Sequence, residues 1–379
     1  MARANWTWLL PIGLVSIILL TGAATAAHPA ILRSAWSHSG GEVFTMSNSV
    51  IGNRVLAFEV GAHGALVPAG NFSTRGIGTG ASLADAGALA LTPGHRHLLV
   101  VNAGDGSLTV FQVRSHGTGP VLTWTDRVAS RGVTPVSVTV HGSLVYVLNA
   151  GNATRAGNIA GFRLTGQGIL QPIAGARQPL SATSSTGAAQ VAFSPNGQWL
   201  VVSEKATSVL DVYPVNARGV AQSPVTTVSN GSTPYGFAFA PSGTLVVSDA
   251  GPGALTSYRV GAAGGLHVVS PALPDGQLAA CWVAIAGGGW AFTSNAHSGT
   301  IGSYHLATNG ALTLGNATAA TTGAGDTDLA TGGRHGSLLF VLVTGSPQIQ
   351  EYAIGPGGSL SFRYAVGSLP VPVEGLAAF

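Results

Sequence analysis

The stretch Ser107-Leu-Thr-Val-Phe-Gln-Val113 is a short apolar run built around one aromatic residue, and the chain contains seven such runs. The central aromatic residues follow one another at intervals of about 45 to 53 positions. They are Phe58, Phe111, Phe162, Tyr213, Tyr258, Tyr304 and Tyr352. A repeat of this length made of strands and turns is typical of a propeller blade, so the spacing predicts seven blades.

Each repeat is expected to contain four strands. In the second repeat they fall at residues 88–92, 98–102, 108–113 and 122–128. Asp105-Gly106 lies between the second and third strands and favours a tight hairpin, because Gly readily adopts the positive φ that the turn requires. Helical periodicity is absent after the N-terminal segment, which indicates an all-β chain.

The two ends of the repeat region complement each other. Gly41-Glu-Val-Phe-Thr-Met-Ser-Asn48 already matches a second strand, whereas residues 374–379 match a first strand and then stop. Pairing these two segments would leave no exposed sheet edge at the junction. We therefore expect a seven-bladed β-propeller with four antiparallel strands per blade, closed by a C-terminal strand in blade one.

The composition supports a folded chain and argues against nucleic-acid binding. Only 8% of the 379 residues are charged and 55 are Gly, but 46% are hydrophobic, which is too many for a disordered chain. The net charge of +3 comes from scattered Arg and one lysine, without the basic run that would follow a phosphate backbone. We expect a monomer that binds a small molecule or a surface partner.

The N-terminal segment is typical of an export signal. Arg3 precedes an apolar run over residues 9–20, and Ala24-Thr-Ala26 fits the small-x-small cleavage pattern. Cleavage after Ala26 or Ala27 would leave residues 28–379 as a single propeller, secreted or periplasmic, with no membrane span. The alternative is an uncleaved anchor, since the apolar region is almost long enough to cross a bilayer. Cys281 is the only cysteine, so no intrachain disulfide can form.

Candidate site residues gather on one face of the expected ring. In a propeller, the turns between second and third strands and the connections between blades share a face, which commonly carries the site. Glu204 and Lys205 are the tentative catalytic pair, because they are adjacent opposite charges at such a turn in a chain with one lysine. An anion anchor or a proton relay could use them, whereas the alternative is a solvated ion pair.

Further polar and aromatic residues could bind a substrate at the same face. The set comprises Gln190, Arg75, Asp249, His297, Tyr235, Trp282 and Glu374. The same rim also carries Asn48, Asn102, Asn149, Asn295, Asp85, Arg177, Asp326 and Asp328. For the Asn and Asp residues the competing interpretation is structural, because these side chains often cap turns through nearby backbone amides. No metal-ligand pattern appears, and no cofactor is expected.

Several stretches resemble the lactonase family of seven-bladed propellers, over about residues 40–379. They are Gly41-Glu-Val-Phe-Thr-Met-Ser-Asn48, Arg131-Gly-Val-Thr-Pro-Val-Ser-Val-Thr-Val-His-Gly142, Gln190-Val-Ala-Phe-Ser-Pro-Asn-Gly197, Val201-Val-Ser-Glu-Lys-Ala206 and Ala280-Cys-Trp282. The family includes 6-phosphogluconolactonases and carboxymuconate cyclase. Its members open or close small lactones without a metal, with His, Arg and carboxylate side chains at the channel mouth.

The resemblance implies a secreted lactonase-like hydrolase acting on a small lactone at the channel mouth. The family's His falls at Ala189 and its Arg near Val209, so Gln190, Glu204 and Lys205 remain at that mouth. The alternative is a non-catalytic extracellular propeller that binds a ligand or a protein with the same face. A convergent set of acid, base and Arg would favour the enzyme, and a merely polar rim would favour the binding protein.

Overall fold

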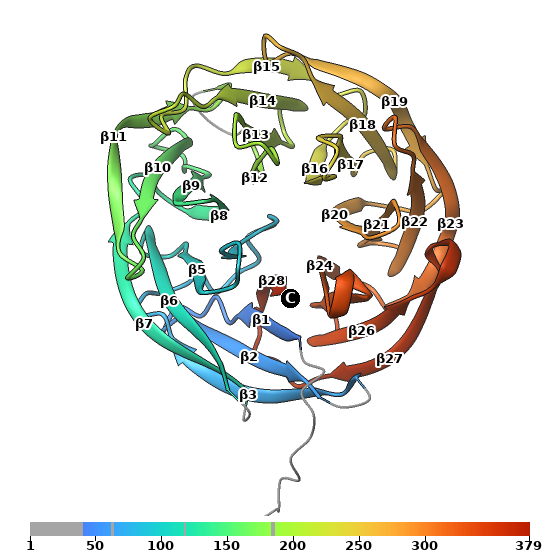
Figure 1. The fold of residues 1–379 in the computed structure, drawn as a ribbon, viewed down its shortest axis with the longest axis horizontal. Helices are drawn as coiled ribbons and strands as arrows, with labels where there is room; N and C mark the ends of the chain where they lie inside the picture. Colours follow the sequence, from blue (N-terminus) through green and yellow to red (C-terminus); the bar gives the residue numbers. More distant parts are fainter. Residues whose placement is uncertain (1–40, 62–63, 117–118, 183–185) are drawn as a thin grey trace, which may run out of the picture. The chain divides into compact units, whose positions relative to one another are not determined.

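A computed structural model describes residues 41–61, 64–116, 119–182 and 186–379. The predicted signal segment and its cleavage site lie outside these residues. The described chain forms seven four-stranded antiparallel sheets arranged around a central channel (Figure 1). The seven-bladed all-β architecture predicted from the sequence is therefore confirmed.

Every blade has the same strand order from the channel outward. The innermost strands are β28 (Glu374–Ala378), β4 (Leu89–Leu91), β8 (Pro135–His141), β12 (Ala188–Phe193), β16 (Pro234–Phe239), β20 (Ala280–Ala286) and β24 (Asp326–Gly332). The second strands are β1 (Glu42–Met46), β5 (His97–Asn102), β9 (Leu144–Asn149), β13 (Trp199–Glu204), β17 (Leu245–Asp249), β21 (Trp290–Asn295) and β25 (Leu338–Val343).

The outer half of each blade continues this order. The third strands are β2 (Arg54–Val60), β6 (Ser107–His116), β10 (Asn158–Leu164), β14 (Val209–Pro214), β18 (Ala254–Val260), β22 (Thr300–Leu306) and β26 (Gln348–Ile354). The outermost strands are β3 (Leu66–Ser73), β7 (Gly119–Ala129), β11 (Leu170–Pro179), β15 (Val225–Val228), β19 (Leu266–Pro274), β23 (Leu312–Thr321) and β27 (Leu360–Val366). Two short 3₁₀ turns, η2 (Arg334–Gly336) and η3 (Pro356–Gly358), complete the described elements.

The repeated aromatic residues occupy equivalent positions on the third strands. Phe111 lies opposite Leu98, Tyr213 opposite Leu200, and all seven aromatic side chains are buried. In blades four to seven the residue is Tyr, and its hydroxyl bonds to the preceding blade. For example, the Tyr213 hydroxyl donates to the Pro179 carbonyl over 2.9 Å, at the end of β11. These four blades are therefore linked by buried hydrogen bonds as well as by apolar packing.

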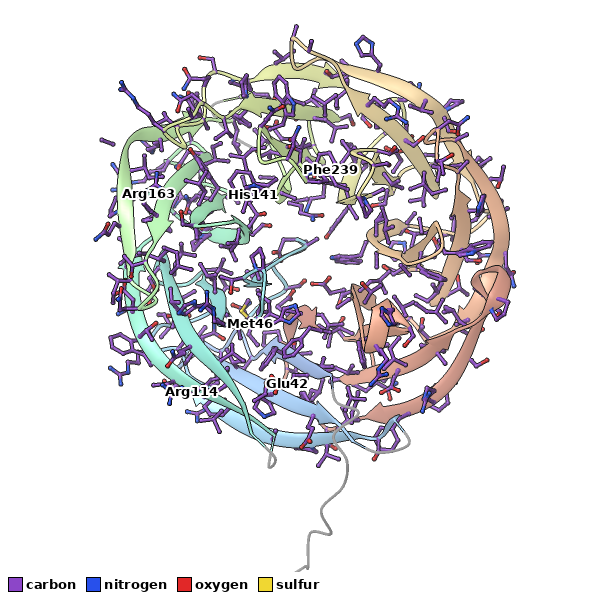
Figure 2. All side chains as sticks on the ribbon, viewed as in Figure 1. Glu42, Met46, Arg114, His141, Arg163 and Phe239 are labelled. Carbon is purple, nitrogen blue, oxygen red and sulfur yellow. The ribbon has the colours of Figure 1, made fainter. Side chains whose placement is uncertain are left out.

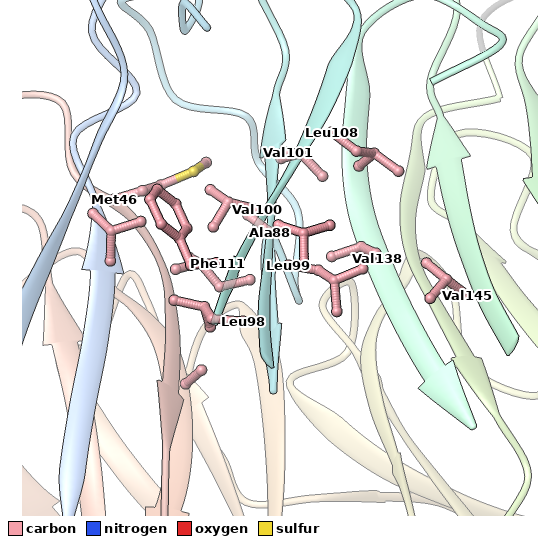
Figure 3. Packing of buried hydrophobic residues seen from close by; sticks show 14 of the residues in the cluster. Met46, Ala88, Leu98, Leu99, Val100, Val101, Leu108, Phe111, Val138 and Val145 are labelled. Carbon is pink, nitrogen blue, oxygen red and sulfur yellow. The ribbon is translucent and has the colours of Figure 1, made fainter. Parts of the chain in front are cut away.

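The core consists of apolar layers between neighbouring blades. Leu98, Leu99, Val100 and Val101 are consecutive residues of β5, and all four are completely buried (Figure 3). A strand covered by a blade on each face has no solvent side, so its sequence is continuously apolar rather than alternating. Burying each such side chain contributes about 1.5–3 kcal/mol.

Arginine side chains such as Arg114 and Arg163 lie on the outside of the ring, whereas several carboxyl groups are buried within it. Figure 2 places Arg114 and Arg163 on the outer part of their blades, while Met46, His141 and Phe239 lie nearer the channel. In the described part of the chain, no helix has the length and apolar character needed to cross a bilayer.

The C-terminal strand closes the ring as predicted. β28 pairs antiparallel with β1, with Phe44 opposite Ala377 and Met46 opposite Glu374. The backbones of Glu42 and Phe379 exchange two further hydrogen bonds of 3.2 and 3.1 Å. Blade one is therefore assembled from both ends of the described chain, and the junction leaves no free strand edge on the channel side of β1.

Deleting residues 374–379 should markedly lower the melting temperature, because it removes the inner strand of blade one and exposes the edge of β1. Differential scanning calorimetry measures the change. Glu374→Gln is the control, because it keeps the strand and changes only its carboxyl group, and it should melt much closer to the parent protein. Equal melting of the truncated and parent proteins would contradict closure by this strand.

Candidate functional site

The channel mouth is crossed by the connection between β3 and β4. Residues 81–87 of this connection, here called the mouth loop, reach inward toward the centre of the ring (the blue-green segment after β3 in Figure 1). The Ala86 amide donates to the Ala189 carbonyl of blade four over 3.1 Å, and the Val138 amide of blade three donates to the Gly87 carbonyl over 2.9 Å. The mouth loop is thus fixed to the neighbouring blades three and four.

Local backbone chemistry explains how the loop makes this turn. Ala84 has φ 49° and Gly87 has φ 79°, so the chain enters and leaves the loop in the left-handed region. At its start, the Asn48 side chain accepts a hydrogen bond from the Thr79 amide and donates to the Ala81 carbonyl. Asn48 therefore stabilises the backbone of this connection, as expected if its role is structural rather than substrate binding.

Three carboxyl groups converge beneath the mouth loop. Asp85 belongs to the loop, Asp328 to β24 and Glu374 to β28, and their side chains are 4%, 7% and 5% exposed. We call them the carboxyl cluster. Asp328 accepts hydrogen bonds from the Leu329 and Leu376 amides, at 2.9 and 3.0 Å. The Leu83 amide donates to Glu374 Oε1 over 3.1 Å.

The carboxyl cluster retains protons near neutral pH. Burial raises the pKa of Asp328 to about 8 and that of Glu374 to about 7. Burial, and then the nearby Glu374 and Asp328 carboxyl groups, raise the pKa of Asp85 well above its usual value. Asp85 Oδ2 is buried without a hydrogen-bond partner among the described residues, so the cluster is only partly satisfied by the protein.

Lys205 is the cation that faces the cluster. Its ammonium group donates to the Ala84 carbonyl of the mouth loop and lies 4.3 Å from the centre of the Tyr235 ring. Burial lowers the pKa of Lys205, while Asp85 and then Cys281 act in the opposite direction. Lys205 is therefore more easily deprotonated than an ordinary lysine, as a general base requires.

Two aromatic side chains lie beside Lys205 and Asp85. Tyr235 and Trp282 have ring centroids 5.0 Å apart, and both rings are buried. Trp282 Nε1 donates to the Asp85 carbonyl over 2.7 Å, which attaches the mouth loop to blade six. Their apolar surfaces strengthen the electrostatic interactions of Lys205 by keeping water away.

A pocket of about 390 Å³ opens beside Lys205. It lies between blades three and four and extends from Leu83 of the mouth loop to the turn at Arg155. Thr186 also lines it, and the buried Thr186 Oγ1 has no hydrogen-bond partner among the described residues. Lys205, Arg155 and Thr186 are thus the residues of this pocket lining that could interact with a polar ligand.

Glu204 lies apart from Lys205 although the two residues are adjacent in sequence. Its carboxylate accepts hydrogen bonds from the Ser181 amide and hydroxyl and from the Thr207 hydroxyl. The side chain is completely buried, and it is not among the charges that shift Lys205. These contacts place Glu204 in a structural network of blade four.

The predicted substrate-binding residues separate into two groups. Tyr235, Trp282 and Glu374 join Lys205 at the mouth. Gln190 lies on the channel wall, where its amide exchanges hydrogen bonds of 2.7 and 3.0 Å with the Phe237 backbone. It therefore connects β12 to β16, and its amide group is occupied by the backbone.

The remaining predicted residues lie away from the pocket. Arg75 is exposed, and its guanidinium lies 3.9 Å from the ring centre of Trp124 on β7. Asp249 is buried at the end of β17, where Ser229 and Thr256 donate to it and burial raises its pKa to about 6. His297 is an exposed turn residue of blade six.

Two further rim amides form side-chain hydrogen bonds within the protein. Asn102 donates to Ser107 and Thr109, and Asn295 donates to Asp275. The Asp326 side chain lies outside the described residues. No group of three or more His, Cys, Asp or Glu side chains with the arrangement of a metal site occurs in the described part.

Sequence reasoning assigned no role to Thr186 or Arg155 and listed Asp85 and Asp328 only as rim residues. The scarcity of charge was the available signal, because there are only 13 acidic residues in the chain. Three of them meet at one end of the channel, in a protein where buried carboxyl groups are costly. Such clusters of perturbed groups are typical of functional sites.

Comparisons with known proteins agree with this fold and with the resemblance. Residues 158–251 match the model of the family described as "Lactonase, 7-bladed beta-propeller". Among curated proteins, none matches the chain in sequence.

Solved structures are similar over most of the ring. A candidate 6-phosphogluconolactonase from Bacteroides fragilis is 15% identical, with a TM-score of 0.69 over 90% of this chain and 98% of that one. The periplasmic gluconolactonase PpgL of Pseudomonas aeruginosa is 19% identical, with a TM-score of 0.68 over 88% of this chain and 98% of that one. The family match over residues 158–251 supports the predicted resemblance to the lactonase family, and the similar structures share the seven-bladed propeller fold of this chain.

Proposed function

We propose that this protein is a lactonase-type hydrolase that opens a small lactone in the pocket beside Lys205. One observation carries the proposal: Lys205 lines an open pocket on one side and faces the buried carboxyl cluster on the other. A lysine with a lowered pKa, next to carboxyl groups with raised pKa values, is the kind of pair that proton transfer requires. The lactonase-type fold supports the same reaction class.

The proposed reaction uses Lys205 as a general base. The neutral amine of Lys205 takes a proton from a water molecule as the water oxygen bonds to the lactone carbonyl carbon. The ring C–O bond then breaks, and the ammonium of Lys205 returns the proton to the departing ring oxygen. The products are a hydroxyl group and a carboxylic acid, which ionises in solution. Asp85 modulates this step, because its charge state changes how readily Lys205 releases a proton.

The other polar groups of the pocket would orient the lactone. The Thr186 hydroxyl has a proton to donate and no acceptor among the described residues, so a carbonyl oxygen would satisfy it. The Arg155 guanidinium, which lines the same pocket, would stabilise negative charge developing on that oxygen. A pocket of about 390 Å³ is in the range of sites for small molecules.

The site of action proposed for this enzyme is outside the cytoplasm. The apolar run over residues 9–20, followed by Ala24-Thr-Ala26, supports export and cleavage after Ala26 or Ala27. N-terminal sequencing of the exported protein tests this, and a retained N-terminal run would favour the anchor instead.

Lys205→Met should lower kcat/KM for lactone opening by at least about 100-fold, because it removes the proposed base while keeping the length of the side chain. Proton release in a pH-stat measures turnover of D-glucono-1,5-lactone, D-glucurono-6,3-lactone and γ-butyrolactone. Arg259→Met, an exposed residue of β18, is the matched control and should retain full activity. Glu204→Gln should lower the melting temperature and leave kcat/KM within a few-fold of the parent value.

Parent-like turnover by the Lys205→Met variant would refute the proposed base. If the parent protein opens none of these lactones but binds one of them in calorimetry, the non-catalytic binding propeller is the better description.

The pH dependence provides a second test. Only the neutral amine of Lys205 accepts a proton, so kcat/KM should rise with pH through the pKa of Lys205, which burial places below its usual value. A negatively charged Asp85 raises that pKa, so Asp85→Asn should move the rising limb to lower pH. The profile is measured with the uncatalysed rate subtracted. Asp105→Asn, whose carboxylate pairs with Arg127 on the same face, should leave the limb in place. A limb that Asp85→Asn does not move would contradict this electrostatic link.

A further inference from the structure

A second hollow lies on the same face, between blades two and three. Its volume is about 230 Å³. Three segments line it: residues 129–133 after β7, residues 155–158 at the start of β10, and Arg177 on β11. Arg131 and Arg177 do not line the pocket beside Lys205, and only Arg155 is common to both.

Three guanidinium groups surround this hollow without counter-charges. Arg131, Arg155 and Arg177 are all exposed, and no carboxylate is among the lining residues. Among the described residues, neither an ion pair nor a hydrogen bond involves any of the three guanidinium groups, whereas Arg127 pairs with Asp105 and Arg363 with Glu351. In a chain with 8% charged residues, three unpaired like charges around one hollow create a local positive potential that favours a bound anion.

Blade one carries Arg75 at the position equivalent to Arg131 of blade two, and the contact of Arg75 is structural. Arg75 follows β3 as Arg131 follows β7, and both have positive φ, at 61° and 64°. The Arg75 guanidinium packs over the Trp124 ring. Arg131 has no aromatic contact of this kind among the described residues, so its guanidinium remains available to a ligand.

An unsatisfied donor lies at the base of the hollow. Asn158 is 2% exposed and lines the hollow, and its Oδ1 accepts a hydrogen bond of 3.2 Å from Asn149 Nδ2. Asn158 Nδ2 is buried with no acceptor among the described residues. Leaving such a donor unpaired costs about 1–3 kcal/mol, and an acceptor oxygen on a bound anion would remove that cost.

Asn149 is screened from the ligand by the backbone. It lies beneath Gly132, where an added Cβ would come within 2.4 Å of the Asn149 Cγ. Gly132 therefore lets the connection after β7 lie close over the Asn149–Asn158 pair. Asn158 and the three arginines line the hollow, and Asn149 does not.

We infer that this hollow binds an oxyanion: a carboxylate, phosphate or sulfate group. Guanidinium groups pair with such groups through two parallel hydrogen bonds, and the Asn158 amide adds a neutral donor. The small volume and the three cations fit a single anionic group, whereas a nucleic acid would require a longer basic track. The hollow can be tested separately from the pocket of Lys205, because Arg131, Arg177 and Asn158 line only the hollow, whereas Arg155 lines both.

Isothermal titration calorimetry at low salt tests the site, with inorganic phosphate, sulfate and D-galacturonate as separate probes. The protein is purified from expression of the full chain. We expect saturable binding of at least one probe, and the preferred probe distinguishes a phosphate or sulfate ester from a uronate. Arg177→Gln and Arg131→Asn should each weaken binding at least tenfold, which corresponds to about 1.4 kcal/mol. Asn is chosen at position 131 because it tolerates positive φ.

Arg259→Gln is the matched control, since Arg259 is an exposed arginine of β18 remote from the hollow in sequence, and it should bind the probes like the parent protein. Lys205→Met should also bind them normally, so this result is separable from the lactonase proposal. No binding of any probe, or equal weakening by the Arg177→Gln and Arg259→Gln variants, would overturn the inference.

Discussion

The pairing of β28 with β1 is the constraint on which both the ring and its site depend. It closes blade one, and the same strand carries Glu374 to the channel mouth. Two residues after Glu374 on β28, the Leu376 amide donates a hydrogen bond to the Asp328 carboxyl group of blade seven. A strand five residues long thereby connects the two ends of the ring and supplies part of the carboxyl cluster. Stability and site geometry are consequently coupled at this junction.

The fold was predictable because its determinants are local and repeated. An aromatic residue such as Phe111 or Tyr213 must fill the same space in each blade, so the third strand repeats in sequence as well as in structure. Turn residues such as Gly106, with φ 69°, mark the strand ends for a backbone reason. The first repeat lacks an inner strand and the last segment supplies one, so the two ends of the repeat region were expected to pair in blade one. The strand limits differ only slightly, since β4 covers residues 89–91 of the expected 88–92.

The site was only partly predictable, because its contacts join distant parts of the chain. Glu204 is the last residue of β13, and Lys205 is the first residue of the turn that follows, so the backbone changes direction between them. Although the two residues are adjacent in sequence, the Glu204 side chain lies inside blade four and the Lys205 side chain lies at the mouth. The hydrogen bond from Trp282 to the Asp85 carbonyl joins residues that are 197 positions apart in sequence. No local sequence pattern predicts the conformation of the mouth loop that brings them together. The sequence placed Lys205, Tyr235, Trp282 and Glu374 on the same face, and the structure brings them together at the channel mouth through a loop that the sequence did not reveal.

Retention of protons by buried carboxyl groups changes the electrical behaviour of the folded molecule. The formal charge of +3 assumes that all 13 acidic side chains are ionised. At pH 7, Asp328 is largely neutral, and Glu374, with its pKa of about 7, is only about half ionised. Asp211 and Glu351, also with pKa values of about 7, lose charge in the same way, while a neutral Lys205 offsets at most one positive charge. The folded ring is therefore more cationic in ion-exchange chromatography than its composition indicates, and unfolding at neutral pH releases protons to the buffer.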